Sequence, residues 1–293
     1  MFGTKHIGQL SIILKRETNM KKLLLLVAAA IIIMIYADIR YASVPVALEK
    51  KLIIEEQEKS EVQEMPVLKV MTYNIHRGVN RNNELDLDGI AKVIIGSGAD
   101  IIALQEVERY SVRTKFQDQI GYLAEKLSMF HAYGKSVNIL NGQYGNAILS
   151  RYPIEEYEVK ELPSKGEKRT LLKARLDIGG KSLPVYSTHL GLNKSERDMQ
   201  LEEIMGIIRN EKSFILAGDF NASVDKLGAV SEICKDSASF GNGSSAATFE
   251  GEGISERIDY IFTSENFEIK EYAVPASQAS DHYPVVSVLE YAD

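Results

Sequence analysis

The chain has 293 residues and a formal net charge of −7, and 45% of its residues are hydrophobic while 26% are charged. This composition is typical of a globular protein with a sizeable core, and the acidic balance argues against a broadly basic face that binds duplex DNA nonspecifically. Cys234 is the single cysteine, which excludes an intrachain disulfide and a cysteine-based structural zinc site.

The first segment with a clear pattern is an apolar run from Leu23 to Tyr36, which follows Lys21 and Lys22. The run is shorter than the roughly 20 residues that a membrane-spanning helix needs, and it fits the hydrophobic part of a secretory signal peptide. An uncleaved N-terminal anchor is the alternative. We therefore predict that residues 1–43 form a signal peptide or membrane anchor and that the following domain lies outside the cytoplasm.

The residues before Met20 do not fit a signal peptide. Residues 15–17 (Lys-Arg-Glu) can be encoded by a purine-rich run that resembles a bacterial ribosome-binding site, a short distance ahead of the Met20 codon. We expect Met20 to be the true start. Expression of unchanged size after mutation of that codon, with Met1 left intact, would contradict this expectation.

Residues 44–66 are rich in Glu, Lys and Gln and predict a charged linker without a core of its own. From residue 67 to 293 short apolar runs alternate with amphipathic stretches. Helices are predicted at 87–95, 117–127 and 195–209, and strands at 67–73, 101–104, 146–151, 170–176, 183–187, 214–217, 257–262 and 285–289. Many strands with few helices predict one α/β domain that contains two sheets.

Polar side chains follow or open most of these predicted strands. They are Asn74, Gln105, Glu106, Asn146, His189, Asp219, Asn221, Asp281 and His282. Asp259 differs, because it lies between Ile258 and Ile261 inside a strand, where burial of a charge is costly without a partner. Since open sheets collect ligand sites at strand ends, these residues could share one cleft.

The residue types in this set suit the hydrolysis of phosphate esters. Glu106, Asn74 and Asp281 offer hard oxygen ligands for Mg²⁺, with Mn²⁺ as an alternative, and Mg²⁺ usually takes one or two carboxylates together with water and substrate phosphate. His189 and His282 could donate hydrogen bonds to phosphoryl oxygens and exchange protons.

Three further residues fit the same chemistry. Asp259 could hold one imidazole in a single tautomer, and Asp219 and Asn221 could both face one water molecule.

Weaker candidates for substrate binding are Asn146, Arg77 and Arg169. Asn146 could simply fix the turn at Tyr144 and Gly145, and Arg77 could simply be solvated, as could the neighbouring His76. Arg169 directly precedes a predicted strand and is a modest candidate for a substrate contact.

The ordered motifs make the sequence recognisable. They are Thr72-Tyr73-Asn74, Leu104-Gln105-Glu106, Tyr144-Gly145-Asn146, Thr188-His189-Leu190, Gly218-Asp219-Phe220-Asn221, Ile258-Asp259-Tyr260 and Ser280-Asp281-His282-Tyr283-Pro284. In this order they resemble the motifs of the endonuclease/exonuclease/phosphatase superfamily, the deoxyribonuclease I-like group, over about Val67 to Tyr291.

This resemblance implies a four-layer α/β/β/α sandwich of two packed mixed sheets, with a Mg²⁺-dependent site at one sheet edge. It implies that Glu106 is the principal metal ligand, assisted by Asn74 and Asp281. It also implies that His282 pairs with Asp259, that His189 contacts the phosphate or the leaving group, and that Asp219 and Asn221 orient or deprotonate the attacking water. Whether Asp219 or His282 is the base stays open.

Several substrates fit the same catalytic set. A metal-dependent phosphodiesterase with nuclease activity is the leading expectation, acting as a monomer that contacts the membrane through its N-terminal segment. A sphingomyelinase-like phospholipid phosphodiesterase is one alternative, and a small-molecule phosphatase with a basic pocket of Lys165, Lys168 and Arg169 is another. A catalytically silent, membrane-tethered binding domain is the alternative of a different class.

Overall fold

The computed structural model describes residues 65–139, 141–240, 246–251 and 253–292. They belong to one compact unit, Glu64–Asp293. The predicted N-terminal segment 1–43 and nearly all of the predicted linker 44–66 lie outside the described residues, so these boundaries stay predictions. Within the described part of the chain, no helix is long and apolar enough to cross a membrane.

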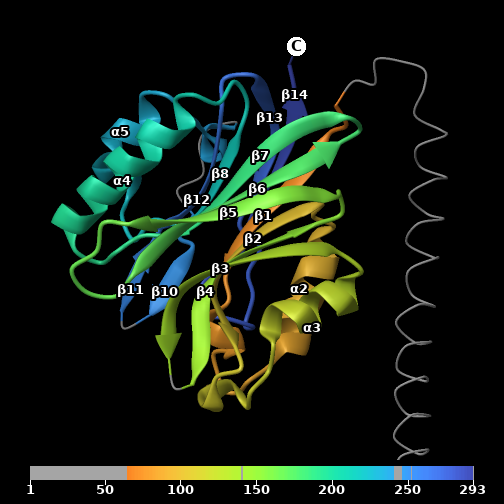
Figure 1. Ribbon diagram of the computed structural model, residues 1–293, viewed down its shortest axis with the longest axis vertical. Coiled ribbons are helices and arrows are strands. Elements are labelled where there is room, and N and C mark those ends of the chain that lie inside the picture. The colour runs from red at the N-terminus through yellow and green to blue at the C-terminus, as the bar shows by residue number, and fades with distance from the viewer. Residues whose placement is uncertain (1–64, 140, 241–245, 252, 293) are drawn as a thin grey trace, which may run out of the picture. The chain divides into compact units, whose positions relative to one another are not determined.

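The unit is built around two six-stranded mixed sheets that pack face to face (Figure 1). The first sheet has the order β13 (Phe267–Ala273), β14 (Val285–Tyr291), β1 (Leu68–Asn74), β2 (Ile101–Arg109), β4 (Gly142–Ser150), β3 (Phe130–Ile139). The second has the order β5 (Ile154–Leu162), β6 (Arg169–Ile178), β7 (Lys181–His189), β8 (Ile215–Asp219), β12 (Asp259–Thr263), β9 (Lys235–Asp236). A separate hairpin pairs β10 (Phe249–Gly251) with β11 (Ile254–Glu256).

Helices cover the outer face of each sheet. The first sheet carries α2 (Leu87–Ser97) and α3 (Gln119–Leu127), and the second carries α4 (Lys194–Ile208) and the short α5 (Gly228–Ser231). Short 3-10 turns occur at His76–Gly78, Val112–Thr114, Val224–Lys226 and Ser237–Ser239. The resulting order of helix, sheet, sheet and helix confirms the predicted four-layer sandwich.

Successive side chains of a strand point to opposite faces of the sheet, and this alternation explains how each sheet packs against another layer on both faces. On β1, Leu68 and Val70 face the core between the sheets, whereas Met71 and Tyr73 face the core beneath α2 and α3. Because both faces of the sheet are covered, apolar side chains occur on both sides of the strand. Helix starts follow from capping, since Asp86 accepts a hydrogen bond from the backbone of Gly89 at 2.7 Å and thereby begins α2.

The sequence patterns miss β3, β5 and β13, and also the short strands β9, β10 and β11. Strand β5 is almost entirely exposed and carries several charged residues, so it lacks the apolar alternation by which half-buried strands are recognised. Strand β2 also runs further than predicted, to Arg109 instead of Leu104, and its pairing with β4 continues beyond a register shift between Leu104 and Val107.

Two parallel strand pairs define the edge at which the polar residues gather. Strand β1 runs parallel to β2 and pairs Asn74 with Gln105, and β7 runs parallel to β8 and pairs His189 with Asp219. The antiparallel strand β12 begins at this same edge, where Asp259 pairs with Asp219. Residues from both sheets therefore lie at one end of the sandwich.

Candidate active site

The side chain of Asn74 contacts site residues from both sheets. Its side-chain Nδ2 lies 3.1 Å from Glu106 Oε1 and 3.0 Å from Asp219 Oδ2, and both distances are those of hydrogen bonds. The same nitrogen lies 3.4 Å from His282 Nε2. One fully buried amide thus contacts groups that come from β2, from β8 and from the loop before β14.

Glu106 reaches Asn74 because the backbone of β2 is irregular at this position. The residue has a φ of 58°, a left-handed conformation that costs a non-glycine residue about 1–2 kcal/mol, and it lies in the register shift between Leu104 and Val107. Bulges of this kind redirect a side chain next to active sites. Burial raises the pKa of the Glu106 carboxyl, and hydrogen bonding to Asn74 opposes that rise.

Asp259 and His282 form a buried pair. His282 Nδ1 lies 2.8 Å from Asp259 Oδ2, and the second oxygen, Oδ1, is buried without a hydrogen-bond partner among the described residues. Burial alone would lower the pKa of His282, but the carboxylates of Asp259, Asp219 and Asp281, with Asp259 the foremost, together outweigh it and raise the pKa to about 10. The expectation that Asp259 needs a partner, and holds an imidazole, matches this geometry.

Asp219 lies between the two imidazoles. Its Oδ2 is 3.4 Å from His189 Nε2 and 3.7 Å from His282 Nε2. Burial lowers the pKa of His189 to about 3, against the opposing effect of Asp219, and the Nδ1 of His189 is buried without a hydrogen-bond partner in the described part of the chain. The two imidazoles therefore differ in charge at neutral pH, His189 being neutral and His282 cationic.

Asn221 follows β8 with a φ of 49°. Its backbone N–H donates to Asp219 Oδ1 at 2.9 Å, and its side-chain Nδ2 donates to the carbonyl oxygen of Leu190 at 2.9 Å. The residue therefore braces the Asp219 carboxylate and ties the end of β8 to the end of β7.

Asp281 lies at the more open side of the site. Its Oδ1 lies 3.2 Å from Ser280 Oγ and 3.7 Å from His76 Nδ1. About a third of the Asp281 side chain is exposed, so it can bind a solvated ion as well as protein groups. Ser280 also donates from Oγ to the carbonyl oxygen of Asn74 at 2.8 Å and so fixes this loop against β1.

The donor set fits a hard divalent cation. Four carboxylates, those of Glu106, Asp219, Asp259 and Asp281, lie at this edge, and within the described residues none of them forms an ion pair with Lys or Arg. A cation near Glu106 would offset the burial that raises its pKa.

Two sets of atoms could serve as ligands. Atoms of Asp219, Asp259 and His282 lie within 4.8 Å of one another, but Asp259 and His282 already bind each other. Oxygens of Glu106, Asp281 and Asn74 are the second candidate set, and hard divalent cations prefer oxygen ligands.

The three weaker candidates for substrate binding lie in different surroundings. Asn146 is buried between the sheets and donates from Nδ2 to the carbonyl oxygen of Thr170 at 3.0 Å, an inter-sheet link. Arg77 has a φ of 59° and contacts His76 Nε2 through Nη2 at 2.8 Å. Arg169 is buried beside Glu167 at 3.2 Å, and its Nε has no partner among the described residues.

Several residues around the site carry no motif of their own. The ring of Phe249 lies 4.9 Å from that of His282. Thr248 Oγ1 accepts hydrogen bonds from the backbone of Ile258 and Asp259, each at 3.0 Å. Arg81 binds the loop that contains Asp281. These contacts depend on tertiary structure, and no spacing in the sequence indicates them.

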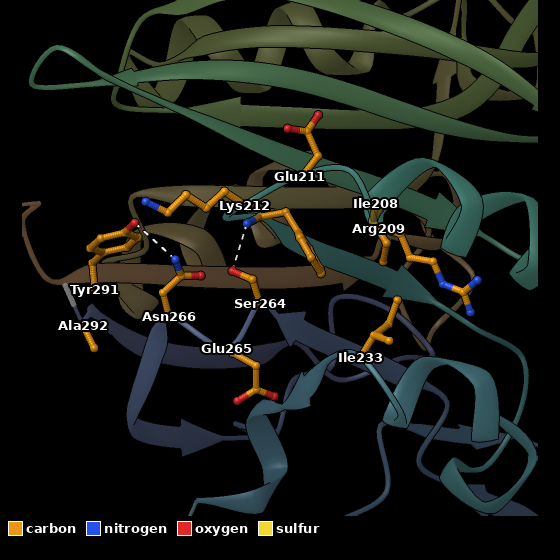
Figure 2. A pocket seen from close by; sticks show the side chains of 11 residues that line it. Ile208, Arg209, Glu211, Lys212, Ile233, Ser264, Glu265, Asn266, Tyr291 and Ala292 are labelled. Carbon is orange, nitrogen blue, oxygen red and sulfur yellow. Dashed lines mark hydrogen bonds between the residues drawn. The ribbon is translucent and has the colours of Figure 1, made fainter.

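A wide pocket of about 690 Å³ lies away from these residues (Figure 2). Phe214, Ser264 and Tyr291 help to line it, and the backbone of Phe214 donates to Ser264 Oγ at 3.1 Å. Phe214 precedes the start of β8, whereas Asp219 ends it. The pocket is therefore at the opposite end of the strands, roughly 15 Å from the polar edge by strand length, and contains none of the predicted site residues.

Comparisons with known proteins identify the family and the fold of this chain. The Endonuclease/Exonuclease/phosphatase family model matches residues 71–282. The uncharacterized protein YbhP of Escherichia coli strain K12 is 35% identical over 167 residues, or 52% of this chain and 66% of that protein, so the chain spans just under two thirds of that relative.

Solved structures share the fold at lower identity. An endonuclease/exonuclease/phosphatase from Beutenbergia cavernae is 24% identical with a TM-score of 0.66, over 78% of this chain and 72% of that one. TDP2 from C. elegans is 20% identical with a TM-score of 0.62, over 79% and 78% of the two chains. Because the family model covers most of its length, the chain belongs to the endonuclease/exonuclease/phosphatase family.

Proposed function

We propose that this protein is a Mg²⁺-dependent hydrolase of phosphate esters and that its substrates are phosphodiesters. The observation that carries the proposal is the convergence of Asn74 and Glu106, from one sheet, with Asp219 and the Asp259–His282 pair at the same edge. Carboxylates that have no Lys or Arg partner among the residues the structure describes lie beside one neutral and one cationic imidazole, and together these groups can bind a cation and transfer protons.

Glu106 would hold the cation, with Asn74 and Asp281 contributing oxygen atoms. When bound, the cation neutralises charge that develops on the phosphoryl oxygens. Mn²⁺ would serve in place of Mg²⁺, because it prefers the same ligand types.

Asp219 is the proposed base. Its carboxylate is held by Asn74 and by the backbone of Asn221, and it can accept the proton of the attacking water. His282 is cationic at neutral pH, so it cannot accept that proton first, and its Nε2–H can donate to a phosphoryl oxygen. Neutral His189, on the other side of Asp219, would donate to the phosphate or the leaving group.

The charge pattern around the site favours a short stretch of nucleic acid as the phosphodiester. Arg77 is half-buried at this edge, while Lys165 and Lys168 are exposed in the loop between β5 and β6. These few cationic side chains could contact a few consecutive phosphate groups, but they do not form the broad basic face of a protein that binds duplex DNA nonspecifically.

The proposed cellular setting depends on the apolar segment from Leu23 to Tyr36. We propose an extracytoplasmic enzyme, a monomer that is either anchored in the membrane by this segment or released after its cleavage. A reporter that is active only outside the cytoplasm, fused to the C-terminus, tests the location. Loss of its signal on deletion of residues 21–36 is the expected result.

Hydrolysis of bis(4-nitrophenyl) phosphate tests the proposed reaction. The wild type should cleave this diester with Mg²⁺ and lose the activity in EDTA, and Glu106→Gln and His282→Ala should each lower the rate by at least about 10²-fold. Glu125→Gln, on the exposed face of α3, is the matched control and should keep the wild-type rate. If all of these proteins show only the background rate with added metal, the proposed activity is wrong.

A substrate panel then identifies the ester. Plasmid DNA, RNA, sphingomyelin vesicles and inositol phosphates would each be incubated with and without EDTA. Cleavage of DNA or RNA alone would support the nuclease assignment. Cleavage confined to sphingomyelin or inositol phosphates would replace it.

A further inference from the structure

The loop Ser280–Tyr283 carries Asp281 and His282 but lies outside the sheet. It falls between the end of β13 and the start of β14, so no continuous strand ladder fixes its backbone. The β10–β11 hairpin lies against it, since the backbone of Tyr283 donates to the carbonyl of Thr248 at 2.6 Å and that of Glu250 donates to the carbonyl of Asp281 at 3.4 Å. The remaining backbone groups of this loop depend on side chains for support.

One side chain, Arg81, binds this loop with two of its guanidinium nitrogens and the hairpin with the third. Nε donates to the carbonyl oxygen of Ser280 at 3.2 Å, and Nη2 donates to that of Asp281 at 2.9 Å. Nη1 donates to the carbonyl oxygen of Glu250, in the hairpin, at 3.3 Å. One planar group therefore joins the loop to the hairpin that packs against it.

Two further contacts keep the guanidinium in place. The backbone N–H of Arg81 donates to the carbonyl of Gln278 at 3.0 Å, and the guanidinium carbon lies 4.8 Å from the centroid of the Tyr283 ring. The Tyr283 hydroxyl in turn donates to Glu250 Oε2 at 2.6 Å. Arg81, Tyr283 and Glu250 thus form one support behind the two site residues.

The chemistry of arginine suits this role better than that of lysine. Guanidinium presents five N–H donors in a fixed plane, whereas an ammonium group is a point charge on a flexible chain. Within the described residues, Arg81 forms no ion pair with a carboxylate, so its donors are directed at main-chain carbonyl oxygens.

We propose that Arg81 is a positioning residue of the active site. By fixing the carbonyl groups of Ser280 and Asp281, it sets the direction of the Asp281 carboxylate and of the adjacent His282 imidazole, without touching the substrate itself. The inference rests on the proposed function, because a fixed loop raises the rate of hydrolysis only if Asp281 and His282 act in the reaction.

Kinetics against metal concentration test this role in the full-length protein. Arg81→Ala should raise the Mg²⁺ concentration for half-maximal hydrolysis of bis(4-nitrophenyl) phosphate and lower kcat, by about 10- to 100-fold in total, with a smaller change in KM for the ester. Arg81→Lys keeps the positive charge but loses the planar set of N–H donors, so its kinetics should stay close to those of Arg81→Ala. Millimolar methylguanidinium should restore part of the rate of Arg81→Ala.

Arg151→Ala is the matched control. This guanidinium pairs with Asp100 at 3.4 Å near the start of β2, at the end of the sheet away from the site. The control should keep wild-type kinetics and should not respond to methylguanidinium.

Hydrogen exchange gives a readout that does not need activity. Backbone amides of residues 278–285 should exchange faster in Arg81→Ala than in the wild type, while those of α4 keep their protection. Arg81→Gln replaces the alanine variant in the same comparison if the latter does not fold. Wild-type exchange in this loop, together with control-like kinetics, would overturn the inference. Faster loop exchange in a protein whose wild type lacks metal-dependent hydrolysis would support loop fixation by Arg81 and reject the proposed function.

Discussion

At the scale of single residues, the site depends on two imidazoles in opposite protonation states. His282 gains a proton through Asp259, and His189 loses one through burial. The two residues affect the pH dependence of the free energy of unfolding in opposite directions. The stabilisation from His282 is complete below its unfolded-state pKa of about 6.5 and is lost as pH rises toward 10. The stability that depends on neutral His189 is complete above about pH 6.5 and is lost as pH falls toward 3.

His189 should therefore make the protein sensitive to mild acid. Between pH 6.5 and 4.5 the unfolded chain binds a proton at His189 that the folded protein excludes, which lowers the free energy of unfolding by up to about 1.4 kcal/mol per pH unit. His189→Gln should lose stability less steeply over this range, as measured by urea denaturation in EDTA. His131→Gln, at an exposed position on β3, is the control and should follow the wild-type slope. Equal slopes in all three proteins would show that the folded state does not exclude this proton.

At the scale of elements, the parallel pairing of β7 with β8 sets the spacing of His189 and Asp219. Gly218 lies opposite Thr188 in this pair, and a Cβ at Gly218 would lie only 2.1 Å from the Thr188 carbonyl oxygen. Real Cβ atoms do not approach a backbone oxygen this closely. A side chain at this position must therefore push the two strands apart directly beside the proposed base.

Gly218→Ala should consequently affect both stability and activity. We expect a loss of about 1–3 kcal/mol in the free energy of unfolding, as for overpacked cores, together with a lower kcat because His189 and Asp219 move apart. Gly96→Ala is the control, since its added Cβ meets no atom within 4 Å in α2 and should stabilise the helix by up to about 1 kcal/mol. Urea denaturation and the diester assay measure both effects, and a Gly218→Ala protein with wild-type activity would contradict the argument.

The same scale shows how much the sequence can predict. The ends of apolar runs correctly locate Asn74, His189 and Asp219, because parallel strands bring their carboxyl ends to one edge. The position of Glu106 on a bulge inside a longer strand cannot be predicted in this way, since a bulge depends on the register with β4. Arg81 also escapes prediction, because its partners are main-chain carbonyls more than a hundred residues away in sequence.

At the scale of the whole molecule, the site exists only when the two sheets are packed together. Asn74 and Glu106 belong to the first sheet, while His189, Asp219 and Asp259 belong to the second. The interior between the sheets is apolar around Leu172 and becomes polar toward the site, where Gln105 Nε2 donates to Ser187 Oγ at 3.3 Å. The residues of the polar edge therefore come together only in the folded sandwich of both sheets.

Leu172→Ala should lower stability without altering the chemistry of the folded protein. The buried cavity should cost about 2–5 kcal/mol, while kcat at a temperature where the variant is folded stays at the wild-type value. Ile95→Ala, at an exposed position on α2, should change the stability by less than about 0.5 kcal/mol.

The single thiol of the chain provides an independent measure of the stability that Leu172→Ala loses. Burial raises the pKa of Cys234 to about 12, so a thiol reagent should modify it at neutral pH only after unfolding. Circular dichroism and thiol labelling of Leu172→Ala should then give the same urea midpoint. Labelling of the folded wild type would show that Cys234 is accessible and cannot serve as this probe.

The direction of β1 has a practical consequence for handling the protein. Met65 packs against the inter-sheet core just before Leu68, and the strand then runs the length of its seven residues, roughly 23 Å, before it reaches Asn74. A fluorophore coupled at position 65 would therefore be joined at the end of β1 opposite Asn74. Coupling there should leave the rate of diester hydrolysis unchanged, whereas coupling at Lys165 or Lys168, in the loop before β6, should lower it.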